Sequence, residues 1–590
     1  MTGDADQVGE EPEDSGRLPH FNLVKEPWIP VLMRDGTTRT LSLDEVFAEA
    51  PGIARVVGES PTITVAIEGI LQAILRRALP EYLSEDPQLV IEAVSEHWNY
   101  WDSAAEQTSQ YLEKWKDRFN LFDEKDPFFQ AAELEKLKGG HDSLNTLISE
   151  APGDEAFLTM RRRAGLESLS FPEAARWLVN AQAYDPSGIR GAAVGDRRAQ
   201  GGKVYPTGPG WAALFGVIAP RTGTLHHDLL LATVPTGVGR LEYDPQADLP
   251  VWERAPLNER PEGVGDGTWE TSTAKDIRSV RREPKGPADL LTWPARRVRL
   301  VREEGRVVGV VLAAGDPIDP QNRFTVEPRA AWRYSKPQSR KFKTTVYMPR
   351  ESPISSDFWR GIEALFPRSV TIERPSRREE VTKFYGPAVS SWLAYLDDQD
   401  ALEETAFQSV TFEVTGATLG SNRSVVDDLI TDSLTLPTSL FAEENLRFRV
   451  EIQDWINLAE QTASAVAGFA ADLARAAGAE DTDDLFTETR GDFLATARNG
   501  FLETLATVDL EDFETTRQEG KRWAETLRRL ALEQRSGLLE ALGSAALVGT
   551  PKGDQYLTAG NAERWFLIRI NKLLGRDATQ QQAKETSENE

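Results

Sequence analysis

The C-terminal quarter of the chain carries the pattern that most restricts its fold. Apolar residues recur there at positions i, i+3, i+4 and i+7, the spacing that lines one face of a helix. The pattern occupies four segments, 442–477, 481–508, 511–546 and 559–575. Four amphipathic helices joined by short connections bury their apolar faces best as an antiparallel bundle. The sequence therefore predicts a four-helix bundle over residues 439–576.

The fourth segment has a predicted start and a predicted buried face. Thr558 precedes it, and threonine is a favoured N-cap because its side-chain oxygen accepts an unpaired backbone N–H. Trp565, Ile568 and Leu573 are assigned to the apolar face. We therefore expect the helix to begin just after Thr558 and to bury these three side chains.

Residues 19–438 are instead predicted to form a domain of mixed helices and strands. Helical spacing over 62–79, 87–117 and 171–183 alternates with strand-like runs, and long loops rich in Gly and Pro separate them. The strand-like runs include 296–301, 306–315 and 342–348. The predicted fold class is α+β: a large mixed α/β N-terminal domain with long loops, followed by the C-terminal antiparallel four-helix bundle.

The two ends of the chain and its composition exclude several classes of protein. Residues 1–18 and 577–590 are polar and poor in apolar residues, so both are predicted to be disordered tails. The sequence has no cysteine, which excludes disulfides, thiolate nucleophiles and cysteine zinc sites. It has no apolar run long enough to cross a membrane and no signal peptide, so a cytoplasmic location is expected.

The charge of the chain is unevenly placed. The formal net charge is -27, yet the segment 275–306 holds ten Lys or Arg against five Asp or Glu. The segment 183–203, AYDPSGIRGAAVGDRRAQGGK, holds five glycines and four cationic residues. Glycine lets backbone approach a ligand closely, and neighbouring cations favour an anion. Because affinity for a polyanion depends on local charge, a local nucleic-acid site is compatible with the acidic total.

A search for catalytic patterns leaves one alternative. The sequence has no nucleotide-binding P-loop, no nucleophile elbow and no H-E-x-x-H zinc motif. His226, His227 and Asp228 form a His-His-Asp run that could chelate a divalent metal in a nuclease or phosphohydrolase. The competing interpretation is a polar turn before a buried apolar strand. We expect the latter, with no catalytic residue, no metal and no cofactor.

Three loops are candidates for binding instead. Gly188 and Gly191 could bring backbone against a narrow minor groove, which excludes bulky side chains. The turn GATLGSNRSVVDD at 416–428 presents Ser421, Asn422 and Arg423, with a strand or helix beginning at 425. A third loop, 319–333, offers Arg323 as an extended cation.

Landmarks along the chain carry a resemblance to a known family. They are FNLVKEPWIPV at 21–31, DPFFQ at 126–130, AFLTM at 156–160, WLVNAQAYDPSGIRGA at 177–192, PQNRFTVEPRAAWR at 320–333 and GSNRSVVDD at 420–428. In this order they resemble the CasA family, the large subunit of the type I-E CRISPR effector complex Cascade. The resemblance extends over about residues 20–575.

The resemblance implies a binding subunit without catalysis of its own. Members of that family recognise the protospacer-adjacent motif of target double-stranded DNA from the minor groove. They use a glycine loop, a cationic finger and a wedge that opens the first base pair, after which guide RNA reads the sequence. The implied partners are the guide RNA, the other Cascade subunits, the target DNA and a helicase–nuclease. A purely structural scaffold subunit is the other alternative.

Roles follow residue by residue from the resemblance. Gly188 and Gly191 have the spacing of the glycine loop, and Arg323 stands where the family has a lysine finger. The segment 421–423 stands at the wedge, with Asn422 in place of the usual glutamine and Arg423 as the second choice. A further set resembles the loop that contacts the guide RNA end and the nearby DNA: Phe157, Arg161, Arg162 and Arg163.

Overall fold

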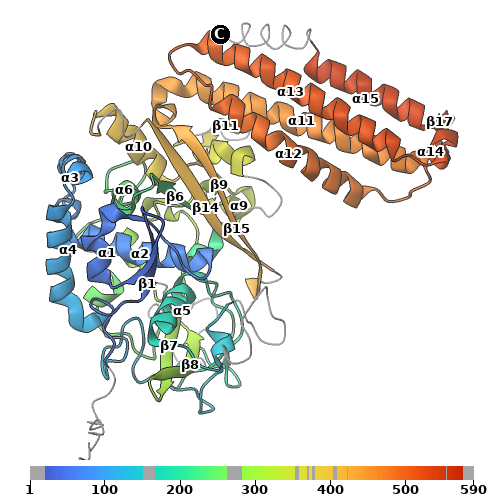
Figure 1. The fold of residues 1–590 in the computed structure, drawn as a ribbon. Helices are drawn as coiled ribbons and strands as arrows, with labels where there is room; N and C mark the ends of the chain where they lie inside the picture. The colour runs from blue at the N-terminus through green and yellow to red at the C-terminus, as the bar shows by residue number, and fades with distance from the viewer. Residues whose placement is uncertain are drawn as a thin grey trace, which may run out of the picture.

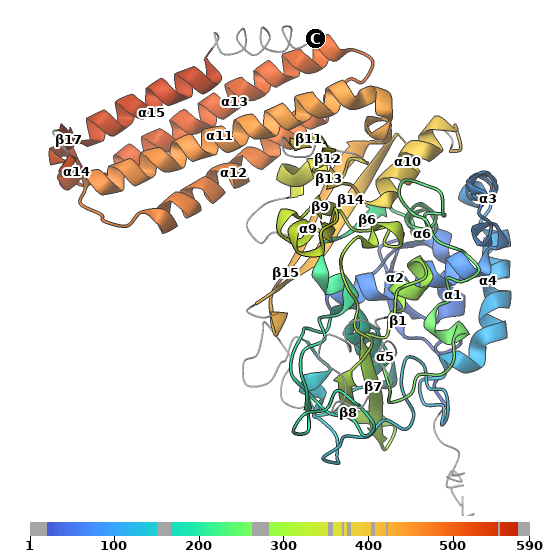
Figure 2. The same cartoon turned by 180° about the vertical axis from the view of Figure 1, so that it is seen from behind.

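A computed structural model describes most of the chain. The described residues are 20–149, 167–261, 282–351, 358–367, 371–374, 379–402, 408–420, 423–552 and 555–575. Both predicted tails, 1–18 and 577–590, lie outside these ranges. A rounded body is formed by the chain up to β15, and a long helical domain projects from one end of it (Figures 1 and 2).

Helices of the body and of the helical domain have the following bounds: α1 Leu43–Ala48, α2 Pro61–Ala78, α3 Pro87–Asn99, α4 Asp102–Trp115, α5 Phe171–Tyr184, α6 Leu225–Ala232, α8 Pro287–Leu291, α9 Lys336–Phe342, α10 Ala388–Asp398, α11 Leu446–Ala476, α12 Asp483–Leu505, α13 Phe513–Glu540, α14 Ser544–Val548 and α15 Ala559–Leu574. The strands are β1 Ile29–Met33, β2 Thr38–Leu41, β3 Ile53–Val56, β4 Arg190–Gly191, β5 Lys203–Val204, β6 Val217–Arg221, β7 Arg296–Glu303, β8 Arg306–Ala314, β9 Trp332–Tyr334, β10 Tyr347–Pro349, β11 Thr371–Arg374, β12 Glu379–Thr382, β13 Phe384–Tyr385, β14 Ser409–Leu419, β15 Val426–Pro437, β16 Thr550–Lys552 and β17 Gln555–Leu557.

The body is built around α2. Every residue of this helix from Thr62 to Arg76 is buried, because α4, α5, α6, α8 and the strand β14 all contact it. Ser60 caps its first turn by accepting the N–H of Ile63. The helix therefore forms the central element of the N-terminal core, as its apolar spacing predicts.

Open antiparallel sheets surround this core. The N-terminal sheet has the order β2–β1–β3, and a second sheet has the order β15–β14–β6. In the second sheet, β14 and β15 form a long hairpin that starts beside the helical domain and runs along one edge of the body (Figure 1). The hairpin therefore connects the turn at 420–425 directly to the start of the helical domain.

Two predicted elements of the body differ from the structure. The pattern over 87–117 is two helices, α3 and α4, which are separated at Tyr100 and Trp101. The predicted strand over 342–348 begins only at Tyr347, because Lys336–Phe342 forms the short helix α9. Lys343 ends that helix with a left-handed backbone, φ +57°, from which a strand cannot start directly.

The helical domain consists of four long helices and a short insertion. α11 contacts α12, α13 and α15, and the successive long helices alternate in direction (Figures 1 and 2). The indole N–H of Trp523 on α13 donates to the carbonyl of Trp455 on α11 at 3.0 Å. The short helix α14 and the β16–β17 hairpin lie between α13 and α15, at the end farthest from the body.

The last helix buries a different face from the one expected. Thr558 caps α15 as predicted, by accepting the N–H of Asn561. Trp565 and Ile568 are exposed, however, and the face that packs inward carries Phe566 and Ile570. The prediction of the buried face was wrong for those two side chains. Residues 565–568 are all apolar, so their spacing alone does not select one face.

The helical domain meets the body through an aromatic contact and several ion pairs. The rings of Trp359 and Phe501 lie with centroids 4.7 Å apart. Arg498 on α12 pairs with Asp432 on β15 at 2.7 Å. These contacts hold the middle of β15 and the segment around Trp359 against α12. Within the described ranges, no helix is both long and apolar enough to cross a membrane.

Candidate nucleic-acid interface

The glycine-rich stretch begins where α5 ends. Asp185 follows the helix, and its carboxylate accepts hydrogen bonds from the guanidinium groups of Arg190 and Arg296. Arg198 forms a two-point contact with Asp196, at 2.9 and 3.0 Å, and donates to the carbonyl of Gly315. Two of the four cations in this stretch are therefore paired inside the protein, and their roles are structural.

Neither glycine of the predicted loop is required by its own backbone conformation. The φ angles of Gly188 and Gly191 lie outside the left-handed region. A Cβ at Gly188 would meet nothing within 4 Å, whereas one at Gly191 would lie 3.3 Å from Cε of Lys136. Gly188 thus leaves open space at the surface, and nothing in the fold explains why a side chain is absent there.

The second predicted loop is the turn of the β14–β15 hairpin. The turn closes through hydrogen bonds from Arg423 N to Gly420 O and from Gly420 N to Val425 O. A Cβ at Gly420 would lie 2.5 Å from a carboxylate oxygen of Asp427, so a larger residue there would displace that exposed side chain. Ser421 and Asn422 lie outside the described residues.

These two loops are in direct contact. The amide of Ser187, next to Gly188, donates to the carbonyl of Arg423 at 2.7 Å. Arg423 has φ +57°, which is uncommon for a residue with a side chain. Its guanidinium forms an ion pair with Glu351, and both side chains remain largely exposed. The structure therefore brings together the first two predicted loops.

Arg323 is placed differently from the expectation. Its Nε donates to the carbonyl of Asp319 at 2.9 Å, and its Nη2 pairs with Glu283 at 3.1 Å. The side chain is only 15% exposed. The hydrogen bond from Arg323 lowers the pKa of Glu283 below its usual value. The expected extended cation is thus folded against the body in this conformation.

All three loops are anchored on one apolar cluster. The cluster surrounds Trp332 and Tyr347, and Tyr184, Phe324 and Leu419 pack in it or against it. Tyr184 precedes the glycine loop, Phe324 follows Arg323, and Leu419 precedes the hairpin turn. Segments far apart in the sequence therefore emerge from a common rigid base.

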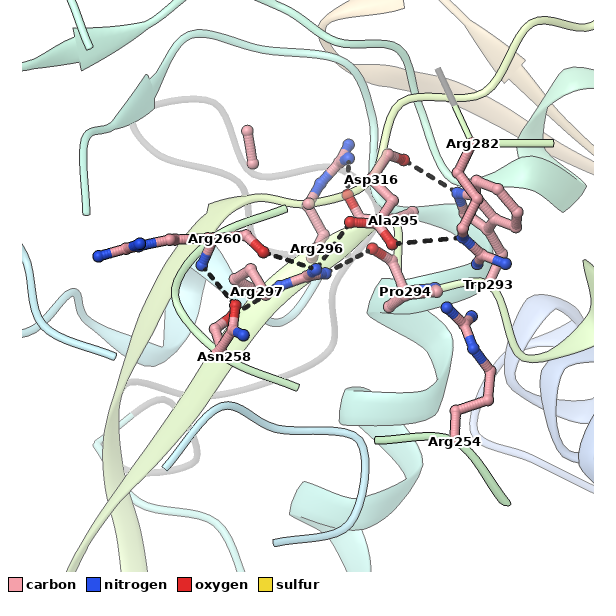
Figure 3. A network of polar contacts seen from close by, with 12 residues as sticks. Arg254, Asn258, Arg260, Arg282, Trp293, Pro294, Ala295, Arg296, Arg297 and Asp316 are labelled. Atoms are coloured by element: carbon pink, nitrogen blue, oxygen red, sulfur yellow. Dashed lines mark hydrogen bonds and ion pairs between the residues drawn. The ribbon is translucent and has the colours of Figure 1, made fainter. Parts of the chain in front are cut away.

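The basic segment 275–306 is largely internal where it is described. Arg297 pairs with Asp316 at 2.7 Å, and its Nε donates to the carbonyl of Asn258 at 2.8 Å (Figure 3). The guanidinium of Arg282 lies 3.8 Å from the ring centroid of Trp293, beside the same network (Figure 3). These two arginines hold loops of the body together, so their charge is used inside the fold.

The His-His-Asp run lies in helix α6, which contradicts the predicted turn before a strand. The ring of His227 stacks on Trp98 with centroids 3.6 Å apart, and its Nε2 lies 3.0 Å from the Trp98 carbonyl. Burial lowers the pKa of His226 to about 3 and raises the pKa of Asp228 to about 7. The Asp228 carboxylate accepts the N–H and hydroxyl of Thr222 at 2.7 and 2.8 Å.

These contacts give the run a packing role. Among the described residues, no group of three or more His, Asp or Glu side chains is arranged to hold a metal ion. The residues expected to contact guide RNA, Phe157, Arg161, Arg162 and Arg163, lie outside the described ranges.

Sequence reasoning missed the acidic partners of the predicted cations. Glu351 lies 72 residues before Arg423, and Glu283 lies 40 residues before Arg323. No local spacing connects such pairs, so only the folded chain shows them.

Comparisons with known proteins agree with the resemblance. The family described as CRISPR-associated protein Cse1 matches residues 22–534. A CRISPR-associated protein CasA/Cse1 from Thermus thermophilus is 28% identical over 466 residues, which is 77% of this chain and 80% of that protein. The crystal structure of Thermobifida fusca Cse1 has a TM-score of 0.81 at 34% identity and covers 94% of this chain and 98% of its own. A chain of a CRISPR RNA-guided surveillance complex shares the fold, with a TM-score of 0.67 at 17% identity over 94% of this chain and 100% of its own.

Proposed function

The chain belongs to the family of the CRISPR-associated protein Cse1, and on this premise we propose that it is the non-catalytic large subunit of an RNA-guided Cascade complex. In this role it recognises the protospacer-adjacent motif of target double-stranded DNA from the minor groove and starts unwinding of the duplex. It then helps to recruit a helicase–nuclease. Its partners are guide RNA, the other Cascade subunits and the target DNA.

One observation carries the proposal. The hydrogen bond between Ser187 N and Arg423 O places the glycine loop beside the hairpin turn. A protein that recognises bases in the minor groove needs a backbone segment without large side chains, so that this backbone can approach the base edges. Beside it, the protein needs a side chain that projects and donates hydrogen bonds to those edges. Gly188 supplies open space, and the turn that contains Arg423 supplies the projection.

The anchoring of the loops supports the same function. Tyr184, Phe324 and Leu419 share one apolar cluster, so the three loops are held at fixed separations. A fixed arrangement lowers the entropy lost when a rigid duplex binds. The Arg323 finger is proposed to exchange Glu283 for a phosphate or a base edge, because that carboxylate is exposed and is replaceable by another anion.

The test is motif discrimination by the assembled complex at a fixed salt concentration. Duplexes with an intact and a scrambled motif are compared for wild type, Gly188→Asp and Asn422→Ala. We expect Gly188→Asp to lose discrimination most, because it adds bulk and a charge that phosphates repel. Open space around Gly188 means that this variant folds normally.

Gly543→Asp is the matched control. It adds the same side chain in open space at the start of α14, in the helical domain. Discrimination that survives Gly188→Asp, or that is lost equally in Gly543→Asp, would contradict the assignment of the loop. The first outcome would favour the scaffold role.

A further inference from the structure

The strands β4 and β5 form a short antiparallel ribbon that begins within the glycine loop, since Gly191 is the last residue of β4. Arg190 pairs with Val204, and Gly191 pairs with Lys203. Side chains along a strand alternate between its two faces. Val204 is buried, so the neighbouring positions Lys203 and Tyr205 belong to the solvent face. Ile189 is one position before the strand and belongs to the same face.

The solvent face carries two large apolar side chains. Ile189 is 56% exposed and Tyr205 is 62% exposed. One further step of the register places these two residues opposite each other across the ribbon. The Tyr205 hydroxyl forms no hydrogen bond with any residue in the described part of the chain. The fold therefore makes little use of this tyrosine.

Lysines surround the ribbon. A Cβ at Gly191 would lie 3.3 Å from Cε of Lys136, and one at Gly202 would lie 3.1 Å from Cε of Lys138. Both glycines thus leave room for a lysine side chain. Lys136 is neutralised by Asp142, whereas Lys138 and Lys203 are exposed. The ribbon therefore combines an exposed aromatic ring with cations, on a chain that is strongly acidic overall.

The ribbon lies beside the point where the two proposed reading loops meet. Ser187, which donates to Arg423, is three residues before β4. A strand of DNA that is unpaired at these loops would therefore reach the ribbon within a few nucleotides.

We propose that the solvent face of this ribbon is a stacking platform for single-stranded DNA. Tyr205 stacks on one unpaired base, Ile189 packs against the edge of that base or its sugar, and Lys138 and Lys203 bind the flanking phosphates. Stacking of bases on aromatic rings next to cations is a general mode of single-strand binding, and it tolerates any base. The inference rests on the proposed function, because duplex opening at the adjacent loops supplies the unpaired strand.

Charge distinguishes this platform from a protein-docking surface. Lysine is depleted in the centres of protein interfaces, where aromatic rings and arginine are enriched. Here lysines flank the ring, and Arg190, the arginine within the two strands, is paired with Asp185. Phosphate groups complement this arrangement.

The test measures binding of the full-length chain to fluorescein-labelled, motif-free single-stranded DNA of about 12 nucleotides by fluorescence anisotropy at low salt. Tyr205→Ala is expected to weaken binding about tenfold, and Tyr205→Phe to leave it unchanged, because the ring alone stacks. Lys203→Glu is expected to weaken binding and to flatten its salt dependence. Tyr556→Ala removes a similarly exposed tyrosine, 58%, on the distant β17, and should have no effect.

The outcomes separate the sources of the ligand. Unchanged DNA binding in Tyr205→Ala overturns the platform, and if assembly with the other subunits weakens instead, the face is a protein interface. Tighter, Tyr205-dependent binding of RNA of the same sequence assigns the face to guide RNA and overturns the assignment to DNA. The oligonucleotide carries no motif, so its binding does not depend on motif recognition. If its binding depends on Tyr205 but the assembled complex does not discriminate between intact and scrambled motifs, the proposed function is refuted and the platform is not.

Discussion

The backbone amide of Ser187 donates a 2.7 Å hydrogen bond to the carbonyl of Arg423, which joins two loops that are 236 residues apart in the sequence. The carbonyl acceptor is oriented by the left-handed backbone of Arg423, φ +57°. The relative position of the proposed glycine loop and wedge therefore depends on one backbone conformation, which most residues disfavour.

The first prediction compares Arg423→Gly with Arg423→Val. Both remove the guanidinium, but glycine adopts positive φ freely while a β-branched residue resists it by about 1–2 kcal/mol. We expect hydrogen–deuterium exchange at the Ser187 amide to stay slow in Arg423→Gly. In Arg423→Val it should become about 5- to 30-fold faster.

Lys343→Val is the control for this experiment, because Lys343 also has φ +57° but lies in a different turn. Its substitution should leave exchange at Ser187 unchanged. Equal protection of Ser187 in Arg423→Gly and Arg423→Val would show that the backbone of Arg423 does not hold the two loops together.

The second prediction concerns the ion pair that restrains the proposed finger. Glu283→Gln removes the charged partner of Arg323, whose Nη2 lies 3.1 Å from that carboxylate. We expect the assembled complex to bind a motif-containing duplex about two- to fivefold more tightly, with a steeper dependence on salt. Competition binding at several salt concentrations measures both quantities.

Glu533→Gln provides the comparison for that variant. Glu533 pairs with Arg529 on the exposed face of α13, away from the loops. If Glu533→Gln tightens binding as much as Glu283→Gln does, the gain reflects the overall charge, and Arg323 has no special role.

Elements could be predicted from the sequence where one physical rule acted alone. The spacing of apolar residues indicated α2 and α5 because both are long, largely apolar segments that pack into the core, α2 on all sides. The glycine-rich segments of the sequence indicated the positions of the loops. The orientation of α15 could not be predicted, since Trp565, Phe566 and Ile568 are equally apolar and only packing against α11 selects Phe566.

The state of the cations could not be predicted for a different reason. Charge patterning counts Arg190 and Arg198 as available for an anion, but both are paired with carboxylates of the same loop. Whether an arginine meets an internal carboxylate or solvent depends on tertiary contacts. The positions of the loops of the candidate site could therefore be predicted from the sequence. Which of their arginines are paired with carboxylates could not.

The third prediction concerns Arg221, whose guanidinium joins three carboxylates in the core of the body. It lies 2.8 Å from Glu68 on α2, 2.9 Å from Glu413 on β14 and 3.7 Å from Asp228 on α6. Arg221→Leu leaves Glu68 and Asp228 buried without this cation, while Glu413 keeps its ion pair with Arg55 at 3.1 Å. We expect a loss of about 3–5 kcal/mol in the free energy of unfolding, measured by urea denaturation.

Arg529→Leu tests the specificity of that loss. It breaks an exposed ion pair within one helix and should change the free energy of unfolding by less than about 0.5 kcal/mol. A loss in Arg221→Leu as small as this would mean that the buried carboxylates take up protons or water without destabilising the fold.

The fourth prediction is a pH dependence of stability that originates in α6. Burial lowers the pKa of His226 to about 3 from about 6.5 in the unfolded chain. Between these values the unfolded chain binds the proton more tightly, so this residue makes the protein less stable as the pH falls from about 6.5. Asp228 acts in the opposite direction, because its pKa of about 7 in the folded protein favours proton uptake by the fold.

His226→Phe separates the two contributions. Phenylalanine keeps the ring that packs edge-on against Trp101, with centroids 5.6 Å apart in the native protein, but it cannot be protonated. The free energy of unfolding is measured by urea denaturation at about pH 7.5 and at about pH 5. On going to the lower pH, we expect His226→Phe to lose less stability, or to gain more, than wild type does. One proton accounts for at most about 1.4 kcal/mol per pH unit. The same pH dependence in both proteins would show that His226 takes up its proton within the folded chain, and that its burial does not hold the imidazole neutral.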